Sequence, residues 1–294
     1  MSYVPVDGQS DLYTLDVPMF GATGVNSPYL IDGPEPTLLD TGPASGADAV
    51  LDALDAIGVQ PTAVSYLVPT HAHLDHAGGA GHLARACENA RIVCHRRAVE
   101  YLTDEEKLVH LAESVERAIG MPAPYGEPVV IDRDRCVVVE GGETLDVGDR
   151  TLDVIDAPGH APHQVCLYDR TADVLFGADA VGMRFGPDNH RPTTPPPDFD
   201  LEAALETIDR LREFAPERIC YAHFGPGEQG AGTAELAAYR QLLPEFVDVV
   251  ARARDRHGDD IGAVATAVDD RYNHWALETD VAGVLRYLEG QSGR

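Results

Sequence analysis

Four times in this chain an apolar run ends and a side chain that can bind a metal ion follows directly. The first run, residues 65–69, is followed by the segment THAHLDH at residues 70–76. Three later runs are followed by His160, Asp179 and His223. In layered α/β proteins, residues beyond one end of neighbouring strands share a common crevice. The sequence therefore predicts a layered α/β fold in which these side chains form one cluster.

The segment 70–76 carries the strongest single signal. His71 and His73 are two residues apart, so on an extended loop their imidazoles point the same way and can chelate one ion. Asp75 and His76 then face a second ion. Imidazole and carboxylate suit Zn, Fe or Mn, and the lack of cysteine in the set argues against a purely structural zinc site. The alternative interpretation is a polar helix N-terminus with incidental histidines.

The rest of the chain predicts mixed α/β structure with helical additions. Residues 47–57 and 201–214 have helical apolar spacing, and residues 129–176 form short strand-like runs separated by Asp and Gly turns. We expect a catalytic domain over residues 1–230 and a helical C-terminal extension over residues 231–294. Residues 95–128, helical and charged and then Pro-rich, are predicted to be a helical insertion.

The apolar face of this insertion has three possible uses. We expect it to form a wall of the pocket above the metal site, and the alternatives are core packing and a dimer contact. A pocket wall would favour acyl or ring substrates over charged phosphodiesters. The residues of that face are Leu102, Leu108, Leu111, Val115 and Ile119.

Charge excludes some partners. Against 22 Lys plus Arg stand 49 Asp plus Glu, giving a formal net charge of -27, and Lys107 is the only lysine. The acids are spread along the chain, which predicts a solvated acidic surface of a halophilic protein rather than a docking face for a basic partner. Binding nucleic acid needs a cationic footprint, and none is visible.

Location and redox state follow from what the sequence lacks. It has no apolar run of eighteen residues and no recognisable signal peptide, so we expect a cytoplasmic protein that does not bind membranes. Five cysteines without a CxxC pair predict reduced thiols. The partners expected are a small-molecule substrate and, as an option, a second copy in a homodimer.

Five motifs in order resemble those of the metallo-β-lactamase superfamily. They are Asp40 in LLDTG, the HAHLDH segment, His160 in APGH, Asp179 in FGAD and His223 in YAHFG. They span residues 40–223, and the resemblance implies a four-layer αββα sandwich. It also implies two divalent metal ions, Zn first with Fe or Mn as alternatives.

The resemblance assigns a role to each motif residue. It implies one ion held by three histidines, a second held by Asp75, His76 and His223, and Asp179 bridging them. Asp40 would orient the metal-binding loop without being a ligand. Asp75 and Asp179, as carboxylates beside a metal-bridging hydroxide, would be the catalytic groups that move its proton. The first ion would be held by His71, His73 and His160.

Within the superfamily, the full HxHxDH pattern with Asp179 is similar to the glyoxalase II and lactonase group. This predicts a hydrolase acting on a thioester, lactone or related ester. The alternatives are an oxidoreductase similar to the mononuclear-iron persulfide dioxygenases, and a phosphodiesterase. The dioxygenases carry a Gly-Arg motif, which Gly182-Met183-Arg184 resembles only loosely. The roles of His163 and Tyr221 stay open between support of the site and ordinary packing.

Overall fold

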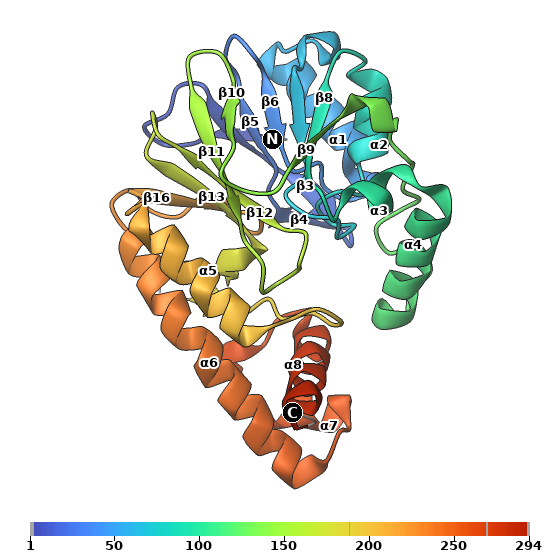
Figure 1. Cartoon of the computed structure of the whole chain (residues 1–294), viewed down its shortest axis with the longest axis vertical. Helices are drawn as coiled ribbons and strands as arrows, with labels where there is room; N and C mark the ends of the chain where they lie inside the picture. Colours follow the sequence, from blue (N-terminus) through green and yellow to red (C-terminus); the bar gives the residue numbers. More distant parts are fainter. Residues whose placement is uncertain (1–2, 188, 269, 293–294) are drawn as a thin grey trace.

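The computed structural model describes residues 3–187, 189–268 and 270–292, and its centre is a pair of stacked sheets (Figure 1). One sheet has the strand order β1-β2-β5-β6-β7-β8-β9, with β6 to β9 parallel to one another. Its strands are β1 Tyr3–Pro5, β2 Leu12–Leu15, β5 Tyr29–Ile31, β6 Thr37–Leu39, β7 Tyr66–Val68, β8 Arg91–His95 and β9 Cys136–Val139.

The other sheet has the order β10-β11-β12-β13-β16. β11 and β13 are both antiparallel to β12, and β16 is parallel to β13, so β11, β13 and β16 all run in one direction. Their carboxyl ends therefore lie at the same edge, where His160, Asp179 and His223 follow. The strands are β10 Thr144–Asp146, β11 Thr151–Asp156, β12 Val165–Asp169, β13 Val174–Ala178 and β16 Arg218–Tyr221.

Short hairpins and helices complete the layers. β3 (Val17–Met19) pairs with β4 (Ala22–Asn26), and β14 (Met183–Arg184) pairs with β15 (His190–Arg191). Three helices, α1 Ala47–Ile57, α2 Ala80–Ala86 and α3 Val99–Thr103, share a buried apolar cluster with the outer face of the first sheet. The helices α5 Leu201–Glu213 and α6 Gly232–His257 cover the second sheet.

Alternating apolar positions explain the double sandwich. In β11, Val154 faces the other sheet while Ile155 faces the helices on the outside, because successive side chains of a strand point to opposite faces. Val68 and Val93 meet this inner face from the first sheet. The predicted αββα fold is confirmed.

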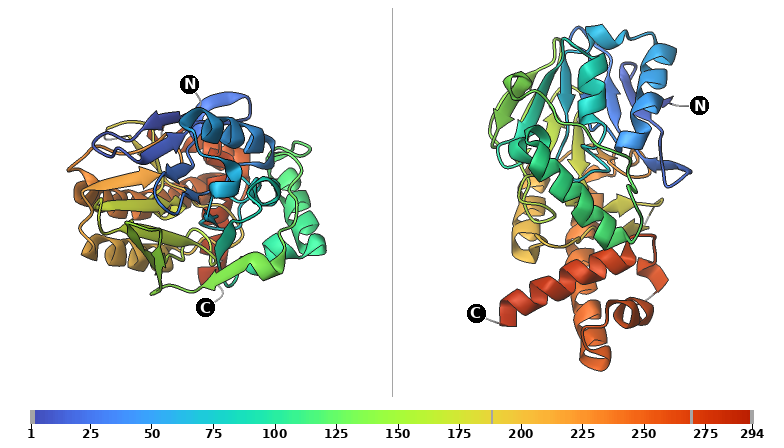
Figure 2. Two further views of the ribbon diagram at one scale, coloured as in Figure 1. Left: turned by 90° about the horizontal axis from the view of Figure 1, so that it is seen from above. Right: turned by 90° about the vertical axis from the view of Figure 1, so that its right-hand side faces the viewer.

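Beyond the sandwich, the chain forms a C-terminal arm, which we define as α6, α7 (Ile261–Ala267) and α8 (Leu277–Ser292). The long helix α6 continues past the sheets, and α7 and α8 pack against it, with α8 crossing it at a large angle (Figures 1 and 2). The arm packs around an apolar cluster that includes Phe246 and Val284 and that α5 shares through Ala204 and Ile208. None of the helices in the described residues is long and apolar enough to cross a membrane.

Between β8 and β9 of the first sheet the chain forms α3 and a second, longer helix, and the Pro-rich residues 121–128 that follow are not helical. The helix α4 (Glu105–Ile119) begins at Asp104, whose side chain accepts a hydrogen bond from the Lys107 amide at 3.1 Å. The expectation of a strand at residues 129–131 is wrong. That segment follows Pro128 and runs beside the helices instead, with the Ile131 amide donating to the Leu102 carbonyl at 2.8 Å.

Candidate metal centre

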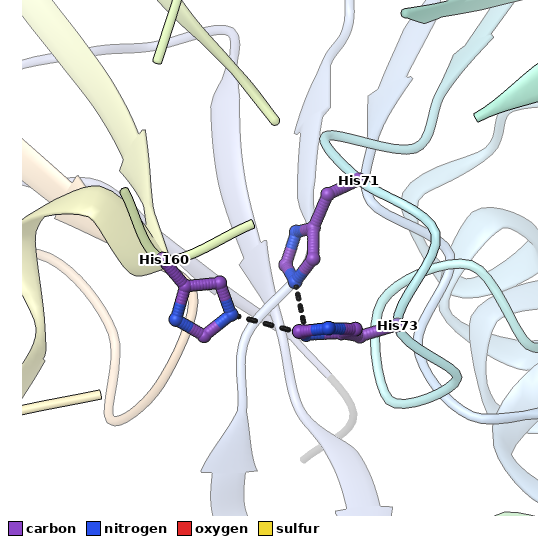
Figure 3. A group of neighbouring side chains, drawn as sticks. All are labelled: His71, His73 and His160. Carbon is purple, nitrogen blue, oxygen red and sulfur yellow. Dashed lines mark hydrogen bonds between the residues drawn. The ribbon is translucent and has the colours of Figure 1, made fainter. Parts of the chain in front are cut away.

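Three histidine side chains meet in a first group of donors (Figure 3). His71 and His73 come from the loop after β7, and His160 comes from the loop after β11. The Nδ1 atom of His73 lies 3.0 Å from the Nε2 atoms of both His71 and His160. Ligands held roughly 2.0 Å from a tetrahedral zinc ion are separated by roughly 3.3 Å. The spacing of these nitrogens therefore fits one ion.

A second group lies beside the first. Asp75, His76 and His223 have donor atoms within 4.8 Å of one another. The Oδ2 atom of Asp75 is 3.5 Å from His76 Nε2 and 3.8 Å from His223 Nε2. His223 follows β16 of the second sheet, so this group, like the first, joins loops from both sheets.

Asp179 lies between the two groups. Its Oδ2 atom is 3.4 Å from His160 Nε2 and 3.5 Å from His76 Nε2, and its Oδ1 atom is 3.5 Å from His223 Nε2. The backbone reaches this position through Ala178, which has a φ of 46° and turns the chain sharply after β13. One carboxylate therefore touches histidines that belong to both groups.

Asp40 holds the ligand loop through both of its carboxylate oxygens. Its Oδ1 atom accepts the Thr70 amide at 2.8 Å and its Oδ2 atom accepts His76 Nδ1 at 2.9 Å. A neutral imidazole that donates from Nδ1 presents the lone pair of Nε2, which here faces the cluster.

Backbone carbonyls orient two other histidines in the same way. His160 Nδ1 donates to the Thr193 carbonyl at 3.0 Å, and His223 Nδ1 donates to the Val25 carbonyl at 3.3 Å. In each case Nε2 is left to face the cluster as an acceptor.

Two buried atoms of the cluster are unsatisfied. Among the described residues, neither His76 Nε2 nor Asp179 Oδ1 has a hydrogen-bond partner. Buried polar atoms are rarely left unpaired, and an ion that binds them is one accepted explanation. With the imidazole spacing, this observation shows that the donor set fits divalent metal ions.

The protonation states also suit metal binding. Burial and the neighbouring histidines hold the pKa of His71 well below its usual value, so that imidazole stays neutral. Burial raises the pKa of Asp75, but His76 and His223 outweigh it and hold the pKa at about 2. His76 is different: burial lowers its pKa, but the carboxylates around it raise it further, so a cation must displace a proton there.

The cluster forms the floor of a cavity of about 560 Å³. One wall is α4, which contributes Leu111, Val115 and Ile119. A second part of the lining comes from the segment of the C-terminal arm that leads into α8, together with residues 195–197. The prediction that the insertion forms a pocket wall is thus confirmed for these three side chains, whereas Leu102, in α3, packs in the core.

Comparison with known proteins agrees with this architecture. The family model of the metallo-beta-lactamase superfamily matches residues 21–223. The chain belongs to this superfamily. The metallo-beta-lactamase fold-containing protein ST1585 of Sulfurisphaera tokodaii is 31% identical over 199 residues, which are 67% of this chain and 72% of that protein. A crystal structure of ST1585 covers 96% of this chain and 99% of its own, with a TM-score of 0.71 and 25% identity.

Other proteins similar to this chain carry different names. An N-acyl homoserine lactonase of Bacillus thuringiensis is 26% identical over 181 residues, 60% of this chain and 62% of that protein. A putative diflavin flavoprotein of Nostoc is also 26% identical, but the match spans only 27% of its length. The metallo-β-lactamase superfamily protein TTHA1429 of Thermus thermophilus shares the fold, with a TM-score of 0.70 at 20% identity.

The structure assigns places to the two residues left open by the sequence. His163 supports the ligand loop: its Nδ1 atom accepts the Ala72 amide at 3.3 Å, and its ring stacks on His71 at 6.2 Å. Tyr221 does not contact a candidate ligand side chain through its hydroxyl. That hydroxyl donates to Glu235 at 3.1 Å and meets His190 Nε2 at 2.8 Å.

Three aromatic residues line the pocket although the sequence did not identify them as candidate site residues. Phe20, Tyr125 and Trp275 come from three distant parts of the chain and line the cavity together. Burial and the charges of Asp75 and Asp179 raise the pKa of Tyr125, so its phenol stays protonated and can donate a hydrogen bond. The only signal in the sequence was that Trp275 is the single tryptophan of the chain.

Proposed function

We propose that this protein is a dinuclear metal-dependent hydrolase that cleaves a lactone, thioester or related ester with an apolar, uncharged acyl group. One observation carries the proposal: two groups of metal-binding side chains meet around Asp179 at the floor of an apolar pocket. The name of the lactonase relative supports the reaction type.

The ligand assignment follows the two groups. In this proposal one ion is held by His71, His73 and His160, the other by Asp75, His76 and His223, and Asp179 bridges them. When bound, two such cations lower the pKa of water to near neutrality and polarise a carbonyl oxygen. Zinc suits the histidine-rich donor set, with iron and manganese as alternatives.

The protein's own groups divide the remaining work. Asp75 is the more exposed of the two cluster carboxylates, with 18% of its side chain accessible against 6% for Asp179. It is therefore the better placed to accept a proton from the attacking water and pass it to the leaving group, while Asp179 holds the two halves together. Tyr125 can donate a hydrogen bond to the substrate from the pocket wall.

The pocket lining indicates the substrate class. Apolar side chains from both α4 and the arm line the cavity, and no lysine or arginine is among the described residues that line it. Glu278 and Asp280 add negative charge on the arm side. An anionic substrate would lose its hydration without gaining a cationic partner from the protein. A phosphodiester or a glutathione thioester is thus disfavoured.

The dioxygenase alternative lacks support from the pocket. Arg184, which corresponds loosely to the arginine of the Gly-Arg motif, forms an ion pair with Glu235 at 2.8 Å and is not among the lining residues. The arginine is therefore paired within the protein and does not line the cavity.

A hydrolysis panel tests the proposal. Lactones, thioesters and phosphodiesters with matched apolar groups are incubated with the zinc-, manganese- or iron-loaded protein in dilute and molar salt. We expect turnover of lactones or thioesters that improves as the acyl chain lengthens. Preferred cleavage of phosphodiesters would contradict the proposal, as would oxygen uptake with a persulfide by a protein holding one iron.

A further inference from the structure

The segment of residues 193–197 touches two of the candidate ligands. The Thr193 carbonyl accepts a hydrogen bond from His160 Nδ1 at 3.0 Å, and the Thr193 hydroxyl donates to the Asp179 carbonyl at 2.7 Å. Thr193 and both ligands are buried. This threonine therefore sets the ring orientation of His160 and the backbone position of Asp179 at once.

The next residue is held by α8. The Thr194 amide donates a short hydrogen bond to the Asp280 carboxylate, and the Thr194 hydroxyl donates to the Asp280 carbonyl at 3.0 Å. The other carboxylate oxygen of Asp280 lies 3.2 Å from His274 Nε2, in a pair whose side chains are almost fully buried. These groups anchor the start of α8 to Thr194.

One turn further along, α8 lies against the same segment backbone to backbone. A Cβ atom added to Gly283 would lie 1.8 Å from the Thr194 carbonyl oxygen and 2.7 Å from the Pro195 carbonyl carbon. Real Cβ atoms essentially never come so close to backbone atoms, so only glycine allows this approach. The helix α8 thus contacts residues 194–195 at two successive places, Asp280 and Gly283.

We propose that α8 is a support of the metal centre, and that Asp280 and Gly283 are positioning residues that act on His160 and Asp179 through Thr194 and Thr193. The region matched by the family model ends at residue 223, so this support comes from outside it. The C-terminal arm then has two roles: it walls the pocket, and it fixes the geometry of the ligands. The inference rests on the proposed metal centre but not on the identity of the substrate.

A pair of glycines on one helix tests this role. Gly283→Ala forces α8 away from Thr194, whereas Gly290→Ala makes the same chemical change where nothing lies within 4 Å of the added atom. Neither glycine lines the pocket. The affinity of the full chain for zinc is measured by competition with a chromophoric chelator, and folding is checked by circular dichroism. We expect Gly283→Ala to weaken zinc binding by about tenfold or more, as loss of an outer contact does, and Gly290→Ala to leave it within about twofold.

A role in folding alone would give a different pattern. It would lower the melting temperature of Gly283→Ala while zinc affinity stayed equal to that of Gly290→Ala, and that result would overturn the proposal. If Gly283→Ala does not fold, Thr194→Val replaces it, because valine keeps the shape and removes the hydroxyl that bonds to Asp280. Thr194→Val is then expected to weaken zinc binding several-fold, and an unchanged affinity would equally refute the support role.

Discussion

The floor and the walls of the pocket are built in opposite ways. The floor consists of polar side chains on loops that follow strands of both sheets, and five of its seven donor residues are buried. The walls come from α4, whose lining side chains are mostly apolar, and from the arm, which contributes both apolar and acidic side chains. The floor is fixed by hydrogen bonds to Asp40, Thr193 and Val25, whereas the walls contribute shape.

The two walls also differ in their attachment. Within α4, Leu108 is the one buried side chain, so little apolar packing holds this helix to the body. The arm packs with α5 around a large apolar cluster, and it contacts Thr194 through Asp280 and Gly283. We therefore expect substitutions in α4 to cost little folding stability, whereas substitutions in the arm should also affect the metal centre.

The largest effect is expected from the carboxylate that joins the two groups of the floor. Asp179→Ala removes the carboxylate oxygens that lie beside His76, His160 and His223. The protein should then bind one ion fewer, and its turnover rate should fall more than about 100-fold. This exceeds the roughly 10- to 100-fold loss that is usual when only an outer contact of a ligand is removed. Metal content and hydrolysis rate are measured together. Asp52→Ala, on the exposed face of α1, is the matched control. A variant at Asp179 with both ions and full turnover would refute the bridging role.

A smaller effect is expected from Asp40, which forms hydrogen bonds with the ligand loop but is not itself a candidate ligand. Asp40→Asn turns one of two acceptor oxygens into a donor, so the hydrogen bond to either Thr70 or His76 is lost. Asparagine tolerates the φ of 61° at this position, so the backbone is preserved. We expect zinc affinity to fall about 10- to 100-fold with little loss of folded protein. Equal affinity would mean that Asp40 does not orient the ligands.

These two variants concern a region that the sequence predicted well. Each donor follows a strand directly, so the chain order places it at the sheet edge once the strands pair, and no distant packing needs to be known. The helix at residues 47–57 is predicted for a similar reason, because its apolar spacing is a local feature of the sequence. In the structure Gly58 ends it in a left-handed conformation.

The walls were harder to predict because they depend on distant contacts. Phe20, Tyr125 and Trp275 meet in one cavity, yet no periodicity relates them. Residues 231–294 were expected to be an appended extension, and the close approach of Gly283 to Thr194 has no local signature in the sequence. The β-branched composition of residues 129–131 predicts a strand. Composition alone does not show that Pro128 and the neighbouring helices keep these residues out of the sheet.

A moderate effect is expected at the α4 wall, where the floor should be untouched. Val115→Asp places a charge in the apolar lining, while Val109→Asp makes the same change on the side of α4 where the side chain is 52% exposed. We expect Val115→Asp to lower kcat/KM for apolar acyl substrates by about tenfold with zinc content unchanged. Equal kinetics of the two variants would show that α4 does not contact the substrate.

The smallest effect concerns stability in acid. Burial lowers the pKa of His163 from 6.5 to about 4, so the unfolded chain binds a proton more readily than the folded one between these values. The stability that this neutral imidazole contributes is complete above pH 6.5 and is lost as the pH falls toward 4. The metal-free protein should therefore melt a few degrees lower at pH 5 than at pH 7. His163→Gln should flatten this dependence, and an equal slope in both proteins would contradict the assignment.

Counting the metal ions tests the central claim most directly. The full chain is loaded with zinc, freed of excess metal by gel filtration and measured by native mass spectrometry alongside elemental analysis. Six donors in two groups, with Asp179 between them as the seventh, predict two zinc ions per chain. A chain that holds a single ion at saturating zinc, with Asp75 and His223 replaceable without loss of that ion, would contradict the dinuclear centre.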